Sequence, residues 1–262
     1  MKRMRRFLAG FSLVAVLASL AVIASVTPAA AYGSCVGNTG TFKTGWKASN
    51  SNQPNQRKFE GVSATTVFSN GNDCYPGTTD HFEPTYIGIE DSFGTDVYFA
   101  RIGYELVPSN SCYQLFYWIS SPHDNRYSFA AGCLVQGSVH SLQVKMVGSG
   151  CSRPPDCIQL FADGVLKAQT VDNPVVDWVG PLQQEIYSRS SNSEADIPGY
   201  ATYEMEYQAI QLQNWNGTWS SICGNYSTWT GQNDNPSRYA SAWLTGSCGT
   251  GTNQLNLWTS AP

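Results

Sequence analysis

Acidic side chains are the first candidates for chemistry in this sequence of 262 residues. Those within or beside β-rich stretches are Glu90, Asp91, Glu105, Glu185, Glu204 and Glu206. A carboxylate on the polar side of a strand is usually only solvated, and Glu204 and Glu206 fit that description. Glu185 differs, because it lies among the uncharged residues of the segment QQEIY at 183–187.

Nucleophilic and metal chemistry find little support in the sequence. No G-x-S-x-G pattern occurs, and no His or Cys stands in a recognisable nucleophile–base context. His123, in a predicted loop, and His140, on a predicted strand, are interpreted as structural residues. The eight cysteines include no C-x2-C spacing and accompany only three histidines. We therefore expect disulfides, and neither a metal site nor any other cofactor.

Four short segments carry a family resemblance by their order and spacing: YIGIED at 86–91, FARIGY at 99–104, FYWI at 116–119, and QEIY at 184–187 followed by IPGY at 197–200. They are similar, in turn, to a W-V-G-I-D-G strand, a strand with a catalytic glutamine, an aromatic W-Y-E-W stretch and a segment with a catalytic glutamate. All four belong to the glutamic peptidases of the eqolisin type (peptidase G1, or A4-type), secreted acid proteases built as a β-sandwich. The chain resembles that family from residue 86 to residue 211.

The resemblance implies that Glu185 is the general base that activates water. It places Arg101 where the family has a glutamine, whose neutral amide stabilises the oxyanion. An arginine can also donate to an oxyanion, but beside Glu185 it would pair with the carboxylate and weaken it as a base. Trp118 replaces an acidic residue of the family, and Tyr86 replaces a tryptophan. The candidate substrate-binding residues are Tyr86, Glu105, Gln114, Phe116, Trp118 and Gln184, of which the two glutamines could supply the amide.

Two functions therefore stay open. One is an acid-active endopeptidase that uses Glu185 with Arg101 or a nearby amide. The other is a non-catalytic protein that binds a carbohydrate or a peptide in the same groove, and an arginine at position 101 favours this second function. Tryptophans also gather in the last 48 residues, at Trp215, Trp219, Trp229, Trp243 and Trp258. They could stack on sugars, but we expect them mainly to fill or cover a small β core.

The elements that must hold these residues are strands, because helical periodicity is nearly absent beyond residue 31. Strand signals lie at 97–106, 113–119, 138–147, 158–162, 165–170 and 200–212. Asp163-Gly164 and Asn216-Gly217 are two-residue hairpin signals. This pattern predicts an all-β, antiparallel sandwich, and the family resemblance makes it a concanavalin-like jelly roll.

The alternation of a strand predicts which residues share a face. Arg101, Gly103 and Glu105 should line a groove that also holds Glu185, within salt-bridge or one-water reach of Arg101. Gly103 should allow a ligand or a neighbouring side chain to approach closely. Ile102 should enter the core. Along the later strand we expect Tyr203, Met205, Tyr207 and Ala209 to lie on one face.

The cysteines predict a disulfide framework without a free thiol. Short loops favour Cys112–Cys133, Cys151–Cys157 and Cys223–Cys248, which leaves Cys35 with Cys74. Each bridge would stabilise the fold by about 2–4 kcal/mol.

Residues 1–31 predict export. Lys2, Arg3, Arg5 and Arg6 precede an uncharged, mostly apolar run at 7–26, and Ala29-Ala30-Ala31 forms an A-x-A cleavage pattern. An uncleaved anchor is the alternative. Cleavage after Ala31 would leave a secreted single domain, residues 32–262, with 11 Lys and Arg against 19 Asp and Glu, a net charge of −8. That charge argues against nucleic acid and anionic lipid as partners. We expect a monomer that is free of the membrane after cleavage and takes a protein, peptide or glycan.

Overall fold

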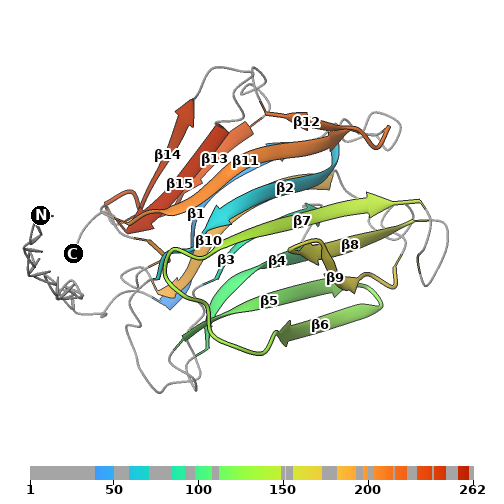
Figure 1. Ribbon diagram of the computed structural model, residues 1–262, viewed down its shortest axis with the longest axis horizontal. Coiled ribbons are helices and arrows are strands. Elements are labelled where there is room, and N and C mark those ends of the chain that lie inside the picture. The colour runs from blue at the N-terminus through green and yellow to red at the C-terminus, as the bar shows by residue number, and fades with distance from the viewer. Residues whose placement is uncertain are drawn as a thin grey trace, which may run out of the picture. The chain divides into compact units, whose positions relative to one another are not determined.

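The computed structural model describes the chain in segments, all within residues 39–259. These segments are 39–49, 59–70, 84–91, 98–107, 112–148, 151, 156–172, 182–192, 197–199, 203–214, 216–222, 229–237, 239–245 and 253–259. The predicted export segment, residues 1–31, lies outside them. Residues 31–262 form one compact unit, and its described elements are all strands, paired antiparallel in two sheets (Figure 1).

The first sheet has seven strands. In spatial order they are β13 (Trp229–Asn233), β1 (Thr39–Ser49), β10 (Leu182–Asn192), β3 (Thr85–Asp91), β4 (Tyr98–Val107), β5 (Cys112–Ser121) and β6 (Asp124–Phe129). Strands distant in sequence lie side by side, because β10 pairs with both β1 and β3. This crossover brings Glu185 within two strands of Arg101.

The second sheet has eight strands. Their order is β14 (Tyr239–Thr245), β15 (Asn253–Thr259), β11 (Met205–Asn214), β2 (Phe59–Val67), β7 (Val139–Val147), β8 (Cys157–Ala162) and β9 (Val165–Gln169), and β12 (Trp219–Ser221) pairs with β11 beside this path. The two sheets confirm the predicted antiparallel β-sandwich of the concanavalin-like jelly-roll type. No helix among the described residues is long and apolar enough to cross a membrane.

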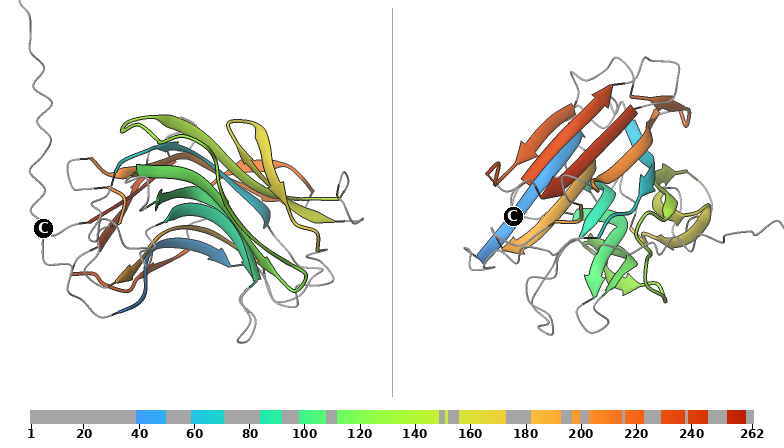
Figure 2. Two further views of the ribbon diagram at one scale, coloured as in Figure 1. Left: turned by 90° about the horizontal axis from the view of Figure 1, so that it is seen from below. Right: turned by 60° about the vertical axis from the view of Figure 1, so that its left-hand side comes forward.

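The core fills the space between the sheets, because alternate side chains of each strand point inward. Ile87, Ile102 and Ile186 come from the seven-stranded sheet, and Val144 and Leu160 from the eight-stranded one; all five are completely buried. Both sheets are bent into an arch, with β1, β3 and β4 on its inner side (Figure 2). The outward face of the seven-stranded sheet is therefore concave, and we call it the concave face.

All six predicted strand regions contain a strand, but the register of one was predicted wrongly. β11 begins at Met205, and Tyr203 lies before it with 58% of its surface exposed. A β-bulge follows between Gln208 and Gln211. Because of the extra residue, the buried series continues from Tyr207 to Ile210, and Ala209 faces solvent. The expectation that Tyr203 and Ala209 share the buried face of Met205 and Tyr207 is therefore wrong.

Both hairpin signals lie at turns between paired strands. Asp163 and Gly164 join β8 to β9 and have φ values of 51° and 74°. Positive φ at both positions is the geometry that favours Asp-Gly in a two-residue hairpin. At the other turn, Gly217 has a φ of 81° and its N–H donates to the carbonyl of Asn214.

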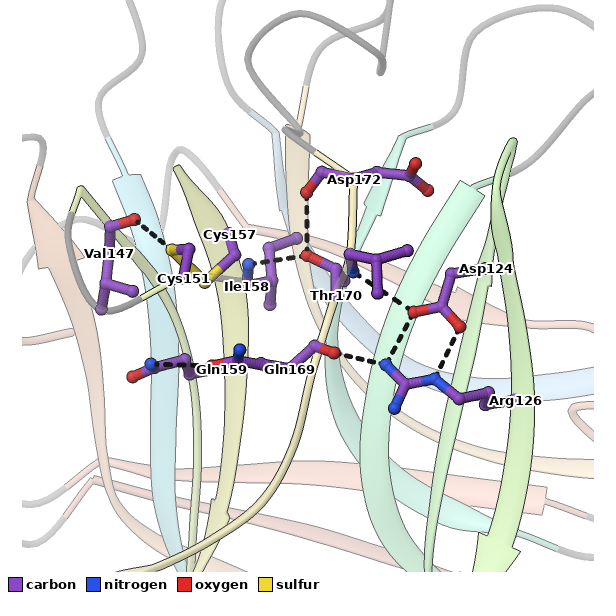
Figure 3. The surroundings of a disulfide bond; sticks show 11 residues. Asp124, Arg126, Val147, Cys151, Cys157, Ile158, Gln159, Gln169, Thr170 and Asp172 are labelled. Carbon is purple, nitrogen blue, oxygen red and sulfur yellow. Dashed lines mark hydrogen bonds and ion pairs between the residues drawn. A yellow bond between two sulfur atoms is a disulfide. The ribbon is translucent and has the colours of Figure 1, made fainter. Parts of the chain in front are cut away.

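Two of the four predicted disulfides fall within the described residues, and both are confirmed: Cys112–Cys133 and Cys151–Cys157. The predicted pairs Cys35–Cys74 and Cys223–Cys248 lie outside the described residues and stay predictions. Figure 3 shows the Cys151–Cys157 bridge near a polar cluster that joins the two sheets. There Asp124 of β6 pairs with Arg126 and accepts the N–H of Val171, which follows β9.

Candidate functional site: a caged arginine on the concave face

The concave face is defined by strand alternation. On β4 it holds Phe99, Arg101, Gly103 and Glu105, and Ile102 points into the core as predicted. Cross-strand pairing extends the row of Arg101 through Gly88 to Glu185 on one side and through Trp118 to Tyr127 on the other. The further side chains of this face are Lys43, Lys47, Tyr86, Glu90, Gln114, Phe116, Phe129, Gln183, Tyr187 and Arg189.

Arg101 and Glu185 form a buried ion pair, which confirms the predicted contact. The Nε of Arg101 donates to Oε1 of Glu185 at 2.5 Å, and both side chains are 2% exposed. Nη2 of Arg101 donates to Oε2 of Glu90, an acid to which the sequence had assigned no role in the site. One guanidinium therefore donates hydrogen bonds to two acidic side chains from neighbouring strands, and the fork of an arginine suits that geometry.

Two aromatic rings enclose the charged cluster. The Cζ atom of Arg101 lies 3.8 Å from the ring centroid of Phe99 and 4.7 Å from that of Tyr86. Such cation–π contacts strengthen when water is excluded. The guanidinium therefore contacts two acids and two rings. Of these four partners, only Phe99 lies on the same strand as Arg101.

Glycines make the room that the cluster needs. A Cβ at Gly88 would lie 2.8 Å from Cγ of Arg101 and 3.2 Å from Oε1 of Glu185. A Cβ at Gly103 would lie 2.6 Å from Cα of Tyr86. The predicted close approach at Gly103 is therefore made by a neighbouring residue of the sheet.

The electrostatics of the face follow from burial. Burial, reinforced by the negative charge of Glu185, raises the pKa of Glu90. Burial also lowers the pKa of Lys43, although the nearby acids Glu185 and Glu90 oppose that shift. The Nζ of Lys43 lies 5.5 Å from the ring centroid of Tyr187. The sequence analysis predicted no strand at residues 39–49 and so missed Lys43, which shares one face of β1 with Lys47 at an even spacing of four residues.

A second acid lies further along β4. Glu105 is 4% exposed, pairs across the sheet with Gln114 and accepts a hydrogen bond from the hydroxyl of Tyr127. Burial raises the pKa of Glu105 to about 7, even though the Tyr127 hydrogen bond acts in the opposite direction. Near neutral pH this group can therefore exchange a proton.

Aromatic rings occupy the part of the face formed by β5 and β6. Phe116 is buried, Trp118 and Phe129 are half-buried, and Tyr127 is 42% exposed. Their ring centroids are joined in a chain: Trp118 lies 5.6 Å from Tyr127, and Tyr127 lies 5.0 Å from Phe129. The result is a partly exposed aromatic surface beside the buried acids.

The predicted site residues therefore separate into two groups. Tyr86, Arg101, Glu105, Gln114, Phe116, Trp118 and Glu185 come together on the concave face. Gln184 does not, because it neighbours Glu185 on the strand and so points to the opposite side. Its side chain is 0% exposed and lies between the sheets, so its assignment as a substrate-binding residue and amide donor is corrected. Gln183, which shares the face of Glu185, was overlooked.

The residues set aside in the sequence have structural contacts. Nδ1 of His123 lies 2.7 Å from the buried Asp172, and Nδ1 of His140 lies 2.9 Å from Asp163. Glu204 accepts a hydrogen bond from Asn256. Within the described segments, no group of three or more His, Cys, Asp and Glu side chains could hold a metal ion.

The C-terminal tryptophans are only partly described. Trp219 and Trp258 are half-buried. Trp229 and Trp243 lie on β13 and β14, and their side chains, like the whole of Trp215, fall outside the described atoms. The expectation that these five residues fill or cover the core stays a prediction.

Comparisons with known proteins give neighbours in structure only. The chain matches no protein-family model and no curated protein. It is similar to a mutant of the alginate lyase Aly36B in complex with alginate trisaccharide, with 9% identity and a TM-score of 0.34 over 59% of this chain and 92% of that one. It is also similar to LamAcat from Zobellia galactanivorans, with 13% identity and a TM-score of 0.31 over 62% and 72% of the two chains.

A third neighbour is the kappa-carrageenase from Pseudoalteromonas carrageenovora, in complex with an oligotetrasaccharide of kappa-carrageenan. It has 10% identity and a TM-score of 0.26 over 85% of this chain and 81% of that one. Because identities and TM-scores are this low, no activity is carried over to this chain from any of the three.

Proposed function

We propose that this is a secreted protein that binds a glycan on its concave face without cleaving it. The observation that carries the proposal is the closed ion cluster. Both carboxylates nearest Arg101 are hydrogen-bonded to it, and the side chain of Glu185 is 2% exposed. A general base needs access to the water that it deprotonates. The carboxylate of Glu185 is paired with Arg101 and almost completely shielded from solvent, so water has little access to it.

The aromatic surface supplies the binding part of the proposal. A sugar ring has an apolar face of C–H groups, and contact of that face with rings such as Trp118 and Tyr127 lowers the free energy by removing apolar surface from water. Gln114 and Lys43 lie on the same face and can hydrogen-bond to hydroxyl groups. A few polar groups around an aromatic lining are typical of small-molecule sites.

Isothermal titration calorimetry with a panel of neutral, uronate-containing and sulfated oligosaccharides tests the proposal. We expect saturable binding to at least one of them, weakened about 30-fold in Trp118→Ala, which corresponds to a contact worth about 2 kcal/mol. Tyr203→Ala is the matched control, because Tyr203 is an exposed ring away from this face. Equal affinity of Trp118→Ala and the wild type, or heat changes that never saturate, would reject the site.

A second candidate, the glutamic-type endopeptidase, keeps one observation in its favour. Glu185 and Arg101 lie in contact on one face, as the resemblance to that family requires of its base and oxyanion donor. Digestion of casein between about pH 2 and pH 7 by the wild type, Glu185→Gln and Arg101→Gln decides it. A peptidase requires wild-type cleavage that Glu185→Gln abolishes. We expect no cleavage by any of the three proteins.

A further inference from the structure

The outward face of the eight-stranded sheet contains a hollow of about 270 Å³ that is remote from the concave face by sheet topology. Its floor consists of small residues of β2 and β7, namely Ser63, Thr65 and Ser141. Larger side chains stand around them, with Gln211 of β11 on one side and Gln143 of β7 and Phe161 of β8 on the other. The hollow therefore forms because short side chains on β2 and β7 lie between longer side chains of the same sheet.

The β-bulge in β11 builds one wall of this hollow. Gln208 and Gln211 are three residues apart, so in a regular strand they would point to opposite faces. The bulge makes them pair with Thr65 and Ser63, which lie on the same face. Ala209, the residue in between, lines the hollow and has a φ of 48°, a left-handed conformation that is costly for a residue with a Cβ. Such strained bulges are frequent beside functional sites.

The polar side chains of the lining make few contacts with one another. Within the described part of the chain, no side-chain hydrogen bond is made by the hydroxyl groups of Ser63, Thr65 and Ser141 or by the amides of Gln143 and Gln211. By contrast, Gln208 outside the hollow donates to Glu206 at 2.6 Å. The Nζ of Lys145 lies 4.8 Å from the centroid of the Phe161 ring. The hollow is therefore lined by five neutral hydroxyl and amide groups and one aromatic ring.

We propose that this hollow is a second binding site, and that its ligand is one uncharged sugar ring of a neutral saccharide. None of the residues that line it is charged, and the cation beside it, Lys145, lies against the Phe161 ring, so a carboxylate or sulfate would lose its hydration without a cation in the lining to pair with. Hydroxyl groups, which both donate and accept, suit a mixed lining of hydroxyl and amide groups. The volume is near the lower limit for small-molecule pockets, about 300 Å³, and fits one ring rather than a long chain.

The test is a nuclear magnetic resonance titration of the full folded protein with cellobiose, maltose and lactose, with glucuronate as the charged probe. We expect at least one of the neutral disaccharides to shift the backbone amides of residues 63–65, 141–143 and 209–211 in a saturable way, with a Kd on the order of millimolar. Glucuronate should bind at least about tenfold more weakly. If no neutral disaccharide shifts these amides, or if glucuronate binds equally well, the proposal is wrong.

Variants separate this site from the concave face. Gln143→Ala and Phe161→Ala should each weaken the shifts at these amides about tenfold. Gln159→Ala should not, since Gln159 lies on the same strand as Phe161 but outside the hollow, where it donates to Gln169 at 3.3 Å. Trp118→Ala should leave these shifts unchanged as well. If Trp118→Ala abolishes them and Gln143→Ala does not, they originate at the concave face and the second site does not exist.

Discussion

Arg101 has the largest of the side chains described as fully buried, and its charge has to be offset at this site. Burial disfavours the guanidinium ion, but the carboxylate of Glu185 and the other neighbouring groups outweigh this effect and raise the pKa of Arg101. A buried ion cluster of this kind contributes little net stability compared with apolar residues, yet removing one partner leaves uncompensated charge behind. The burial of Glu90 and Glu185 therefore depends on the positive charge of Arg101.

Replacing Arg101 by methionine tests this dependence. We expect Arg101→Met to lower the free energy of unfolding at neutral pH by about 3–5 kcal/mol, because two buried carboxylates lose their common partner. The loss should shrink in acid, where both carboxyl groups become protonated. Urea denaturation measures both effects.

Arg126→Met is the matched control for that substitution. Arg126 pairs with Asp124, but the Arg126 side chain is 42% exposed and its loss leaves one buried carboxylate and not two, so the substitution should cost less than Arg101→Met. If Arg101→Met costs no more than Arg126→Met, the cluster is not the stabilising feature described above.

Glu105 makes stability depend on pH. Burial raises its pKa from 4.5 to about 7 in the folded protein. The folded state therefore binds this proton more tightly than the unfolded state, so the stabilisation is complete below pH 4.5 and is lost as pH rises to about 7. The free energy of unfolding should decrease by about 3 kcal/mol across that window.

Glu105→Gln removes the titrating group and should abolish this part of the pH dependence, as followed by urea denaturation at several pH values. Tyr127→Phe removes the hydrogen bond that lowers the pKa of Glu105, so it should move the transition to higher pH. An identical pH profile for the wild type and Glu105→Gln would contradict the assignment.

Strand alternation was enough to predict much of the site residue by residue. It placed Arg101 and Glu105 on one face of their strand and Ile102 on the other face. It also excludes Gln184 from the face of Glu185, although the family resemblance had suggested that residue. The partnership of Arg101 with Glu90 depends on which strands are neighbours, and no local pattern in the sequence reports that.

Among the elements, β11 shows how a single extra residue changes a face. Its buried residues run Met205, Tyr207, Ile210 and Leu212, so the spacing of two becomes three at the bulge. The same break is visible in the sequence YQAIQL at 207–212. The bulge could have been predicted from it, whereas its partner strand β2 could not, because β2 lies more than a hundred residues earlier in the chain.

The bulge leads to a prediction about stability. Ala209→Gly should raise the free energy of unfolding by about 0.5–1 kcal/mol, since glycine adopts a φ of 48° without the steric cost of a Cβ. Ala64→Gly, in the strand opposite, should instead lower it by about 1 kcal/mol, because that alanine is buried in a regular strand. Thermal unfolding of both variants measures the two shifts. Destabilisation by Ala209→Gly would show that the methyl group of Ala209 packs favourably.

On the scale of the whole molecule, the two sheets present faces of different chemistry. The concave face of the seven-stranded sheet combines buried acids, Arg101 and partly exposed rings, whereas the outward face of the eight-stranded sheet holds an uncharged polar hollow. The sandwich itself was predictable from short strands and hairpin signals. The division of its outer surfaces was not, because it depends on the crossover that brings β10 between β1 and β3.

The indole N–H signal of Trp118 provides the most direct test of binding at the concave face. It can be assigned with Trp118→Phe and followed by nuclear magnetic resonance while an oligosaccharide that binds in calorimetry is added. We predict a saturable shift of this signal and of the backbone amide of Tyr127, with the oligosaccharide recovered at its original length. A Trp118 signal that no bound oligosaccharide moves, or a shortened sugar after the titration, would contradict non-catalytic glycan binding at this face.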